Sequence, residues 1–164
     1  MSNTVTNVVF AGLGGQGIIK SSDILAAAAF AAGLDVKKSE LHGMSQRGGS
    51  VTSDVRFGSE VLSPMVPAQE ADFLLVLEPT QVEINRGLLR PGGVLLSPDL
   101  IPDGALRNKK SLNVAMLGVL SVLLALQPEH WEQGLKECLA VRLHKVNEQA
   151  FALGRRQGEA RFKS

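Results

Sequence analysis

The fold is decided by the stretch Asn7-Val-Val-Phe-Ala-Gly-Leu-Gly-Gly-Gln-Gly17 and by the Ala-, Ile- and Leu-rich run from Ile18 to Gly33 that follows it. The β-branched and aromatic residues 7–11 predict a buried strand. The run after the glycines predicts a buried helix with Gly33 as its C-terminal stop. Asp35 to Glu40 predicts a second strand, so this opening forms one βαβ unit with parallel strands.

Strand and helix patterns continue to alternate along the rest of the chain. We expect strands at 51–57, 73–77 and 94–97, an edge or loop segment at 61–67, a helix from Pro79 to Leu89, a buried helix capped by Ser111 or Asn113 that ends before Pro128, and amphipathic helices at 129–139 and 145–156. This alternation predicts an α/β fold, a Rossmann-like open, mostly parallel sheet with helices on both faces. Both glycine loops then lie at the carboxyl edge of the strands, where such sheets bind ligands.

Length, charge and cysteine content exclude several classes of protein. A length of 164 residues fits one compact domain. A net charge of +1 disfavours nonspecific binding to nucleic acid or membranes. The apolar run Val114 to Leu126 is shorter than the ~20 residues that a membrane span needs, and the N-terminus has no secretory signal pattern, so we expect a cytoplasmic protein. The single cysteine, Cys138, excludes an internal disulfide or a four-cysteine iron–sulfur cluster.

The first glycine loop has two interpretations. Gly12, Gly14 and Gly17 satisfy G-x-G-x-x-G between a strand and a helix, which suits either an anion or nucleotide contact or a tight turn packed against a neighbouring chain. For a nicotinamide cofactor, Glu40 could hold the ribose hydroxyls. Gly15 and Gln16 argue against that cofactor because they place a polar amide at the loop tip, so we expect Gln16 to have a role of its own.

The second glycine loop, Ser39 to Ser50, concentrates chemical groups. Arg47 stands beside two glycines and is a candidate clamp for a carboxylate or phosphate. His42 is either a proton shuttle or a backbone-bonding side chain. His130 and His144 lack the neighbouring ligands of a metal site, so we expect none.

Five segments carry a resemblance to a known family. They are the turn Gly12-x-Gly-Gly-Gln-Gly17, the loop Ser39-Glu-Leu-His-Gly-Met-Ser-Gln-Arg-Gly-Gly49, Glu70-Ala-Asp-Phe-Leu-Leu with the later Glu78-Pro79, Asn113 with its Met-Leu-Gly, and the tail Val146 to Gly154. Together they resemble the gamma-type subunit of 2-oxoacid:ferredoxin oxidoreductases. The likeness is greatest to the indolepyruvate:ferredoxin oxidoreductase beta subunit, and it implies one gamma-type domain over 1–164 with C-terminal helices at about 129–157.

The resemblance implies a subunit of a complex that oxidatively decarboxylates a 2-oxoacid, with indolepyruvate or another aryl pyruvate as the candidate substrate. The products are an acyl-CoA and carbon dioxide, with electrons passed to ferredoxin. Thiamine diphosphate, [4Fe-4S] clusters and coenzyme A are expected in the full complex, on partner subunits. We expect no catalytic residue and no bound cofactor in this chain, which lacks the Gly-Asp-Gly motif of thiamine sites, and we expect the isolated chain to be inactive.

The resemblance also assigns a site. Gly12, Gly14, Gly15, Gln16 and Gly17 form a loop that faces the partner or a phosphate-bearing ligand such as coenzyme A, and Arg47 is a candidate anion contact. Two other functions remain open. One is a free-standing NAD(P)-dependent oxidoreductase that uses the glycine turn and Glu40. The other is a noncatalytic interaction module that self-associates through exposed apolar surface when isolated.

Overall fold

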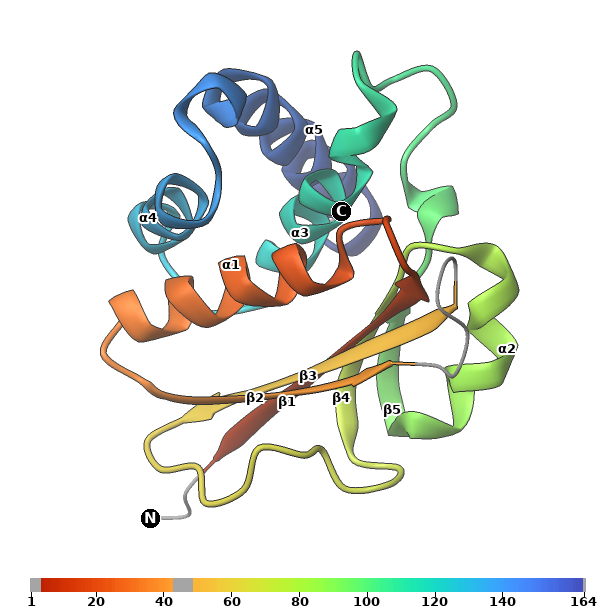
Figure 1. Ribbon diagram of the computed structural model, residues 1–164, viewed down its shortest axis with the longest axis vertical. Helices are drawn as coiled ribbons and strands as arrows, with labels where there is room; N and C mark the ends of the chain where they lie inside the picture. Colours follow the sequence, from red (N-terminus) through yellow and green to blue (C-terminus); the bar gives the residue numbers. More distant parts are fainter. Residues whose placement is uncertain (1–3, 43–48, 164) are drawn as a thin grey trace.

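The computed structural model describes residues 4–42 and 49–163, which form a layered α/β structure (Figure 1). Its described strands build one five-stranded sheet in the order β2-β3-β1-β4-β5. Their bounds are β1 Val5–Leu13, β2 Asp35–His42, β3 Ser50–Gly58, β4 Ala71–Val76 and β5 Leu89–Leu96. The α/β prediction is confirmed.

The expectation of a mostly parallel sheet holds only in part. Strand β1 pairs with β4, and β4 with β5, in parallel, whereas β3 pairs antiparallel with both β1 and β2. Strands β1 and β2 run in the same direction, as the βαβ pattern predicts, but β3 lies between them. The physical reason is the short connection from β2 to β3, because two strands joined without a long crossover can pair only as an antiparallel hairpin.

Helices α1, α3, α4 and α5 lie on one side of the sheet (Figure 1). Their bounds are α1 Ile18–Ala31, α3 Leu112–Ser121, α4 Pro128–Cys138 and α5 His144–Phe162. Helix α4 packs against α1, and α5 packs against α3. The main core is buried between these helices and the sheet, and its largest fully buried side chains include Trp131, Phe10, Leu75, Met116 and Leu117.

The other face of the sheet carries much less helix than we expected. Instead of a helix from Pro79 to Leu89, the described chain has a 3-10 turn (η1, Pro79–Gln81), the short α2 (Val82–Asn85) and a second 3-10 turn (η2, Arg86–Leu88). Asn85 and Gly87 are poor helix formers, which accounts for the interruption. Apolar residues of this segment cover a small second cluster built on Val9, Ala11, Leu74 and Val76.

Several predicted boundaries also shift. Helix α3 ends at Ser121 rather than just before Pro128, and α5 extends to Phe162. Three further 3-10 turns are η3 Pro98–Leu100, η4 Lys109–Ser111 and η5 Val141–Leu143. Ser111 occupies the N-cap position of α3, as predicted, but its hydroxyl donates to the Asn108 carbonyl and makes no capping bond to the helix. Asn113, the alternative cap, bonds the glycine turn instead. Within the described ranges, no helix combines the length and apolar character needed to cross a membrane.

Candidate functional site

The glycine turn joins the carboxyl end of β1 to the start of α1. Gly15 and Gly17 have φ of 90° and 83°, a left-handed conformation that favours glycine. A Cβ on Gly12 would lie 2.7 Å from Ile18 Cδ1 and 2.8 Å from Gln16 Oε1, so these side chains would have to shift to admit it. Two of the three motif glycines, Gly12 and Gly17, therefore shape the turn, together with Gly15, which the motif does not require.

Gln16 stabilises the turn through two side-chain hydrogen bonds. Its side-chain Oε1 accepts a hydrogen bond from the Leu13 backbone N–H at 2.7 Å, and its Nε2 donates to Glu78 Oε1 at 3.2 Å. Glu78 stands just beyond β4, the neighbouring parallel strand, and its other carboxylate oxygen accepts from the Thr80 N–H. Gln16 thus connects the turn to the end of the next strand.

Gly17, the residue just before α1, is held in place by a side chain of α3. Asn113 Nδ2 donates to the Gly17 carbonyl at 3.3 Å, and Ser21 Oγ donates to the same carbonyl at 2.8 Å. A Cβ on Gly17 would lie 2.5 Å from Asn113 Nδ2. The beginnings of α1 and α3 therefore meet at Gly17.

A hollow of about 460 Å³ opens beside the turn. It is lined by Gly15, Gln16, Gly17, Leu77, Lys109, Lys110 and Leu112. Neither lysine side chain has a hydrogen-bond or ion-pair partner among the described residues. The α1 N-terminus adds unpaired N–H groups with a partial positive charge, so this arrangement can hold an anion. Sequence reasoning missed the two lysines; the signal was the Asn-Lys-Lys-Ser run just before the buried helix.

The two glycine loops meet at this edge of the sheet. Gly14 N–H donates to the Gly49 carbonyl at 2.9 Å. Arg47, the other predicted anion contact, lies outside the described residues, as does the side chain of His42. The structure therefore brings the start of β3 to the turn and leaves the placement of Arg47 as a prediction.

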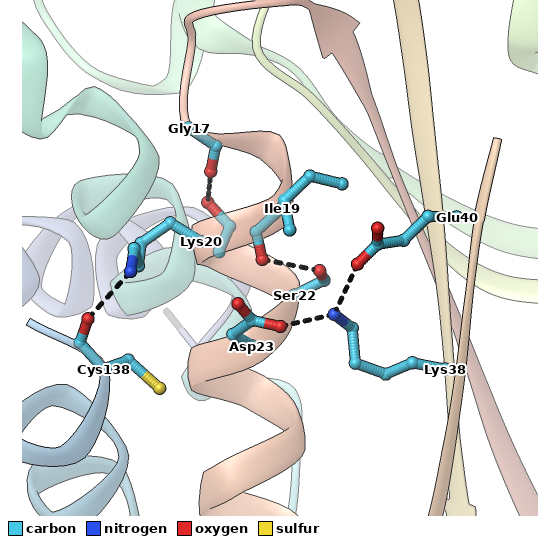
Figure 2. Close-up of polar contacts among 9 residues, drawn as sticks. Gly17, Ile19, Lys20, Ser22, Asp23, Lys38, Glu40 and Cys138 are labelled. Atoms are coloured by element: carbon cyan, nitrogen blue, oxygen red, sulfur yellow. Dashed lines mark hydrogen bonds and ion pairs between the residues drawn. The ribbon is translucent and has the colours of Figure 1, made fainter. Parts of the chain in front are cut away.

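The structure does not bring Glu40 to the glycine turn. Figure 2 shows the Glu40 carboxylate paired with Lys38, whose ammonium also contacts Asp23 on α1; Lys38 Nζ lies 3.0 Å from Glu40 Oε1. Burial alone would lower the pKa of Lys38, but its hydrogen bonds and charge interactions with Asp23 and Glu40 outweigh it and raise the pKa. Because β3 separates β2 from β1, Glu40 lies two strand spacings, about 10 Å, from β1.

Cys138 lies at the end of α4, where its carbonyl accepts a hydrogen bond from Lys20 (Figure 2). Burial, followed by the nearby Asp23 charge, raises the pKa of the Cys138 thiol. A thiol with a raised pKa is a poor nucleophile and metal ligand at neutral pH. Within residues 4–42 and 49–163, no three metal-ligating side chains gather into a site.

Comparison with known families gives a match over residues 7–103, to the family described as pyruvate ferredoxin/flavodoxin oxidoreductase. The indolepyruvate oxidoreductase subunit IorB of Methanothermobacter thermautotrophicus is 32% identical, over 90% of this chain and 95% of that one. The same subunit of Thermococcus kodakarensis is 44% identical over 91 residues, which are 56% of this chain and 45% of that one. The chain thus spans less than half of the Thermococcus relative.

A solved structure shares the fold. It is a 2-oxoglutarate:ferredoxin oxidoreductase from Magnetococcus marinus with 2-oxoglutarate, coenzyme A and succinyl-CoA bound. The superposition has a TM-score of 0.83 at 23% sequence identity, and it covers 99% of this chain and 32% of that one. In that protein the present fold is therefore one part of a chain about three times as long.

Proposed function

Because the chain belongs to the pyruvate ferredoxin/flavodoxin oxidoreductase family, we propose that it is the gamma-type subunit of a 2-oxoacid:ferredoxin oxidoreductase complex. The complex would convert a 2-oxoacid and coenzyme A into an acyl-CoA and carbon dioxide. The two electrons released would pass to ferredoxin. The observation that carries this proposal is the family match, supported by relatives that are subunits of such oxidoreductases and by the Magnetococcus fold.

The redox chemistry is assigned to partner chains, because the residues of this chain do not fit the groups that perform it. A [4Fe-4S] cluster usually takes four cysteine thiolates, and this sequence has one cysteine, with a raised pKa. We infer that a partner supplies thiamine diphosphate and the clusters.

We further propose that the glycine turn is the ligand-facing part of this subunit. The turn of Gly12, Gly14, Gly15, Gln16 and Gly17 would face a phosphate of coenzyme A, with the N–H groups at the start of α1 as its hydrogen-bond donors. Lys109 and Lys110 would supply positive charge beside the turn, and Arg47 would add a further anion contact. The unpaired lysines favour this role over a purely structural seam, because two cations lining one hollow are stabilised by an anion.

The indolepyruvate branch supplies the candidate substrate. Both IorB relatives are named as indolepyruvate oxidoreductase subunits. We therefore propose indolepyruvate or another aryl pyruvate as the 2-oxoacid, with the substrate pocket on the thiamine-bearing partner.

The test of the complex is to co-express the tagged chain with its native partner and to assay ferredoxin reduction. We expect reduction that requires the 2-oxoacid, coenzyme A and both chains, with indolepyruvate used in preference to pyruvate and 2-oxoglutarate. Activity of the partner alone at the full rate would contradict the subunit role. A preference for pyruvate would contradict only the substrate assignment.

The turn is tested separately with Lys109→Gln/Lys110→Gln and with Arg47→Ala. If the turn binds coenzyme A, the KM for coenzyme A rises about tenfold while the complex still assembles and the KM for the 2-oxoacid is unchanged. Lys145→Gln, an exposed lysine of α5 outside this hollow, is the matched control. An unchanged KM for coenzyme A with weakened assembly would identify the turn as a seam between subunits.

A further inference from the structure

A second hollow lies between the 105–111 segment and helix α5, and it shares no described lining residue with the hollow at the glycine turn. Its volume is about 270 Å³. Its lining comprises Ala105, Leu106, Arg107, Ser111, Val146, Gln149, Ala150, Leu153 and Arg156. Apolar side chains therefore form much of the wall, and two arginines also line it.

Helix α5 supplies one side of this hollow as a continuous stripe. Val146, Gln149, Ala150, Leu153 and Arg156 follow the spacing i, i+3, i+4, i+7, i+10, so they lie on one helix face. Ala150 and Leu153 give this stripe an apolar middle, and Arg156 places a positive charge at its end. Across from it, Leu106 and Arg107 repeat the same pairing of an apolar side chain with a guanidinium.

The two guanidinium groups lack counter-ions. Arg107 and Arg156 have no hydrogen-bond or ion-pair partner among the described residues, in contrast to Arg155, which bonds Ser121 and Glu159. The described lining contains no carboxylate, and the Gln149 amide is also unpaired. Two like charges at one hollow attract an anion, and a guanidinium can bind a carboxylate through two parallel hydrogen bonds.

We propose that this hollow binds a small organic carboxylate with a compact apolar body. The guanidinium groups would hold the carboxylate, and Leu106, Ala150 and Leu153 would pack against the body. The size is suitable, since a cavity of about 150 Å³ already binds benzene. Arg107 and Arg156 do not line the hollow at the glycine turn, so this site is separate from the proposed coenzyme A contact.

The test is isothermal titration of the full chain in low-salt buffer with phenylacetate, acetate and inorganic phosphate. Phenylacetate should bind saturably at one site and more tightly than acetate, because acetate lacks an apolar body. Arg107→Gln and Arg156→Gln should each weaken phenylacetate binding about tenfold. Leu153→Asn should weaken phenylacetate binding more than acetate binding.

The control is Arg142→Gln, the same substitution at an exposed arginine that does not line the hollow. It should bind phenylacetate as the unmodified chain does, and urea unfolding verifies that every variant folds. No saturable phenylacetate binding would overturn the proposal, as would binding unchanged in Arg107→Gln and Arg156→Gln. Phosphate bound as tightly as phenylacetate would also overturn it, because the apolar wall would then contribute nothing.

Discussion

Gln16 is the residue on which the geometry of the glycine turn depends most. One amide side chain bonds the end of its own strand through Leu13 and the end of the neighbouring strand through Glu78. The amide group accepts from a backbone N–H through its oxygen and donates to a carboxylate through its nitrogen. A carboxylate at this position could make the first bond and would be repelled at the second.

We therefore predict that Gln16→Glu lowers the free energy of unfolding by about 1–2 kcal/mol at pH 7, because a donor to Glu78 is replaced by a like charge. The measurement is urea denaturation. The matched control is the exchanged pair Gln16→Glu/Glu78→Gln, which restores one donor and one acceptor and should recover most of the loss. Equal stability of the single and exchanged variants would contradict the role assigned to this bond.

The ion pairs of Lys38 should make the free energy of unfolding depend on pH. Its pKa in the folded chain is raised above the ordinary 10.5, so its ion pairs contribute fully below that pH and are lost as the pH rises above it. Lys38→Met should lower the free energy of unfolding by about 1 kcal/mol at pH 8, since the cluster is only partly screened from solvent. The difference from the unmodified chain should narrow above pH 10.5.

The control for that experiment is Lys37→Met, the next residue on the same strand. Lys37 Nζ lies 4.0 Å from Asp35, with both side chains substantially exposed, so its loss should have little effect at any pH. Equal effects of the two substitutions, or a Lys38→Met difference that stays constant up to pH 11, would show that the cluster around Asp23 and Glu40 does not stabilise the fold.

At the scale of elements, the closest packing is between α3 and α5. A Cβ on Gly118 would lie 2.2 Å from the Phe151 carbonyl, and one on Gly158 would lie 3.0 Å from the Val119 carbonyl. These glycines let the two helix backbones touch. The contact fixes α5, which carries one wall of the proposed carboxylate site.

Gly154→Ala should be the most damaging alanine substitution in this contact, because the new Cβ would overlap the Ala115 carbonyl and force the helices apart. We expect a loss of about 3 kcal/mol. Gly158→Ala should cost less, and Gly87→Ala should be nearly neutral, since no atom lies within 4 Å of its added Cβ. The midpoint of urea denaturation is measured for each of the three variants. Similar midpoints for Gly154→Ala and Gly87→Ala would refute the packing argument.

At the scale of the molecule, the position of β3 decides between two classes of protein. A dinucleotide site needs an acid at the end of the strand next to the glycine turn, to hold the ribose hydroxyls. Here the strand next to β1 on that side is β3, which runs antiparallel, and Glu40 on β2 is paired with Lys38. The topology therefore counts against a nicotinamide-dependent oxidoreductase.

This topology predicts that the isolated chain shows no saturable binding of NADH at micromolar concentrations. Fluorescence of the reduced nicotinamide is a direct measurement, and Glu40→Gln is the matched variant, which should behave identically. Saturable binding that is lost in Glu40→Gln would restore the free-standing oxidoreductase as the better hypothesis.

The sequence by itself determined the features that depend on neighbouring residues. The strand, glycine turn and helix over residues 5–31 follow from local propensity and from the steric freedom of Gly15 and Gly17, and Gly33 ends the helix as predicted. The family resemblance also rested on such short segments, and the family match confirms it.

Only the tertiary structure decided what depends on residues far apart in the chain. The insertion of β3 between β2 and β1, the pairing of Gln16 with Glu78, and the lysines beside the turn all result from contacts between distant segments. An alternating strand pattern does not show which strands will be its neighbours, and a lysine run before a helix does not show what it faces. These features required the packed sheet because hydrophobic burial, rather than local preference, selects among arrangements that the sequence pattern leaves equivalent.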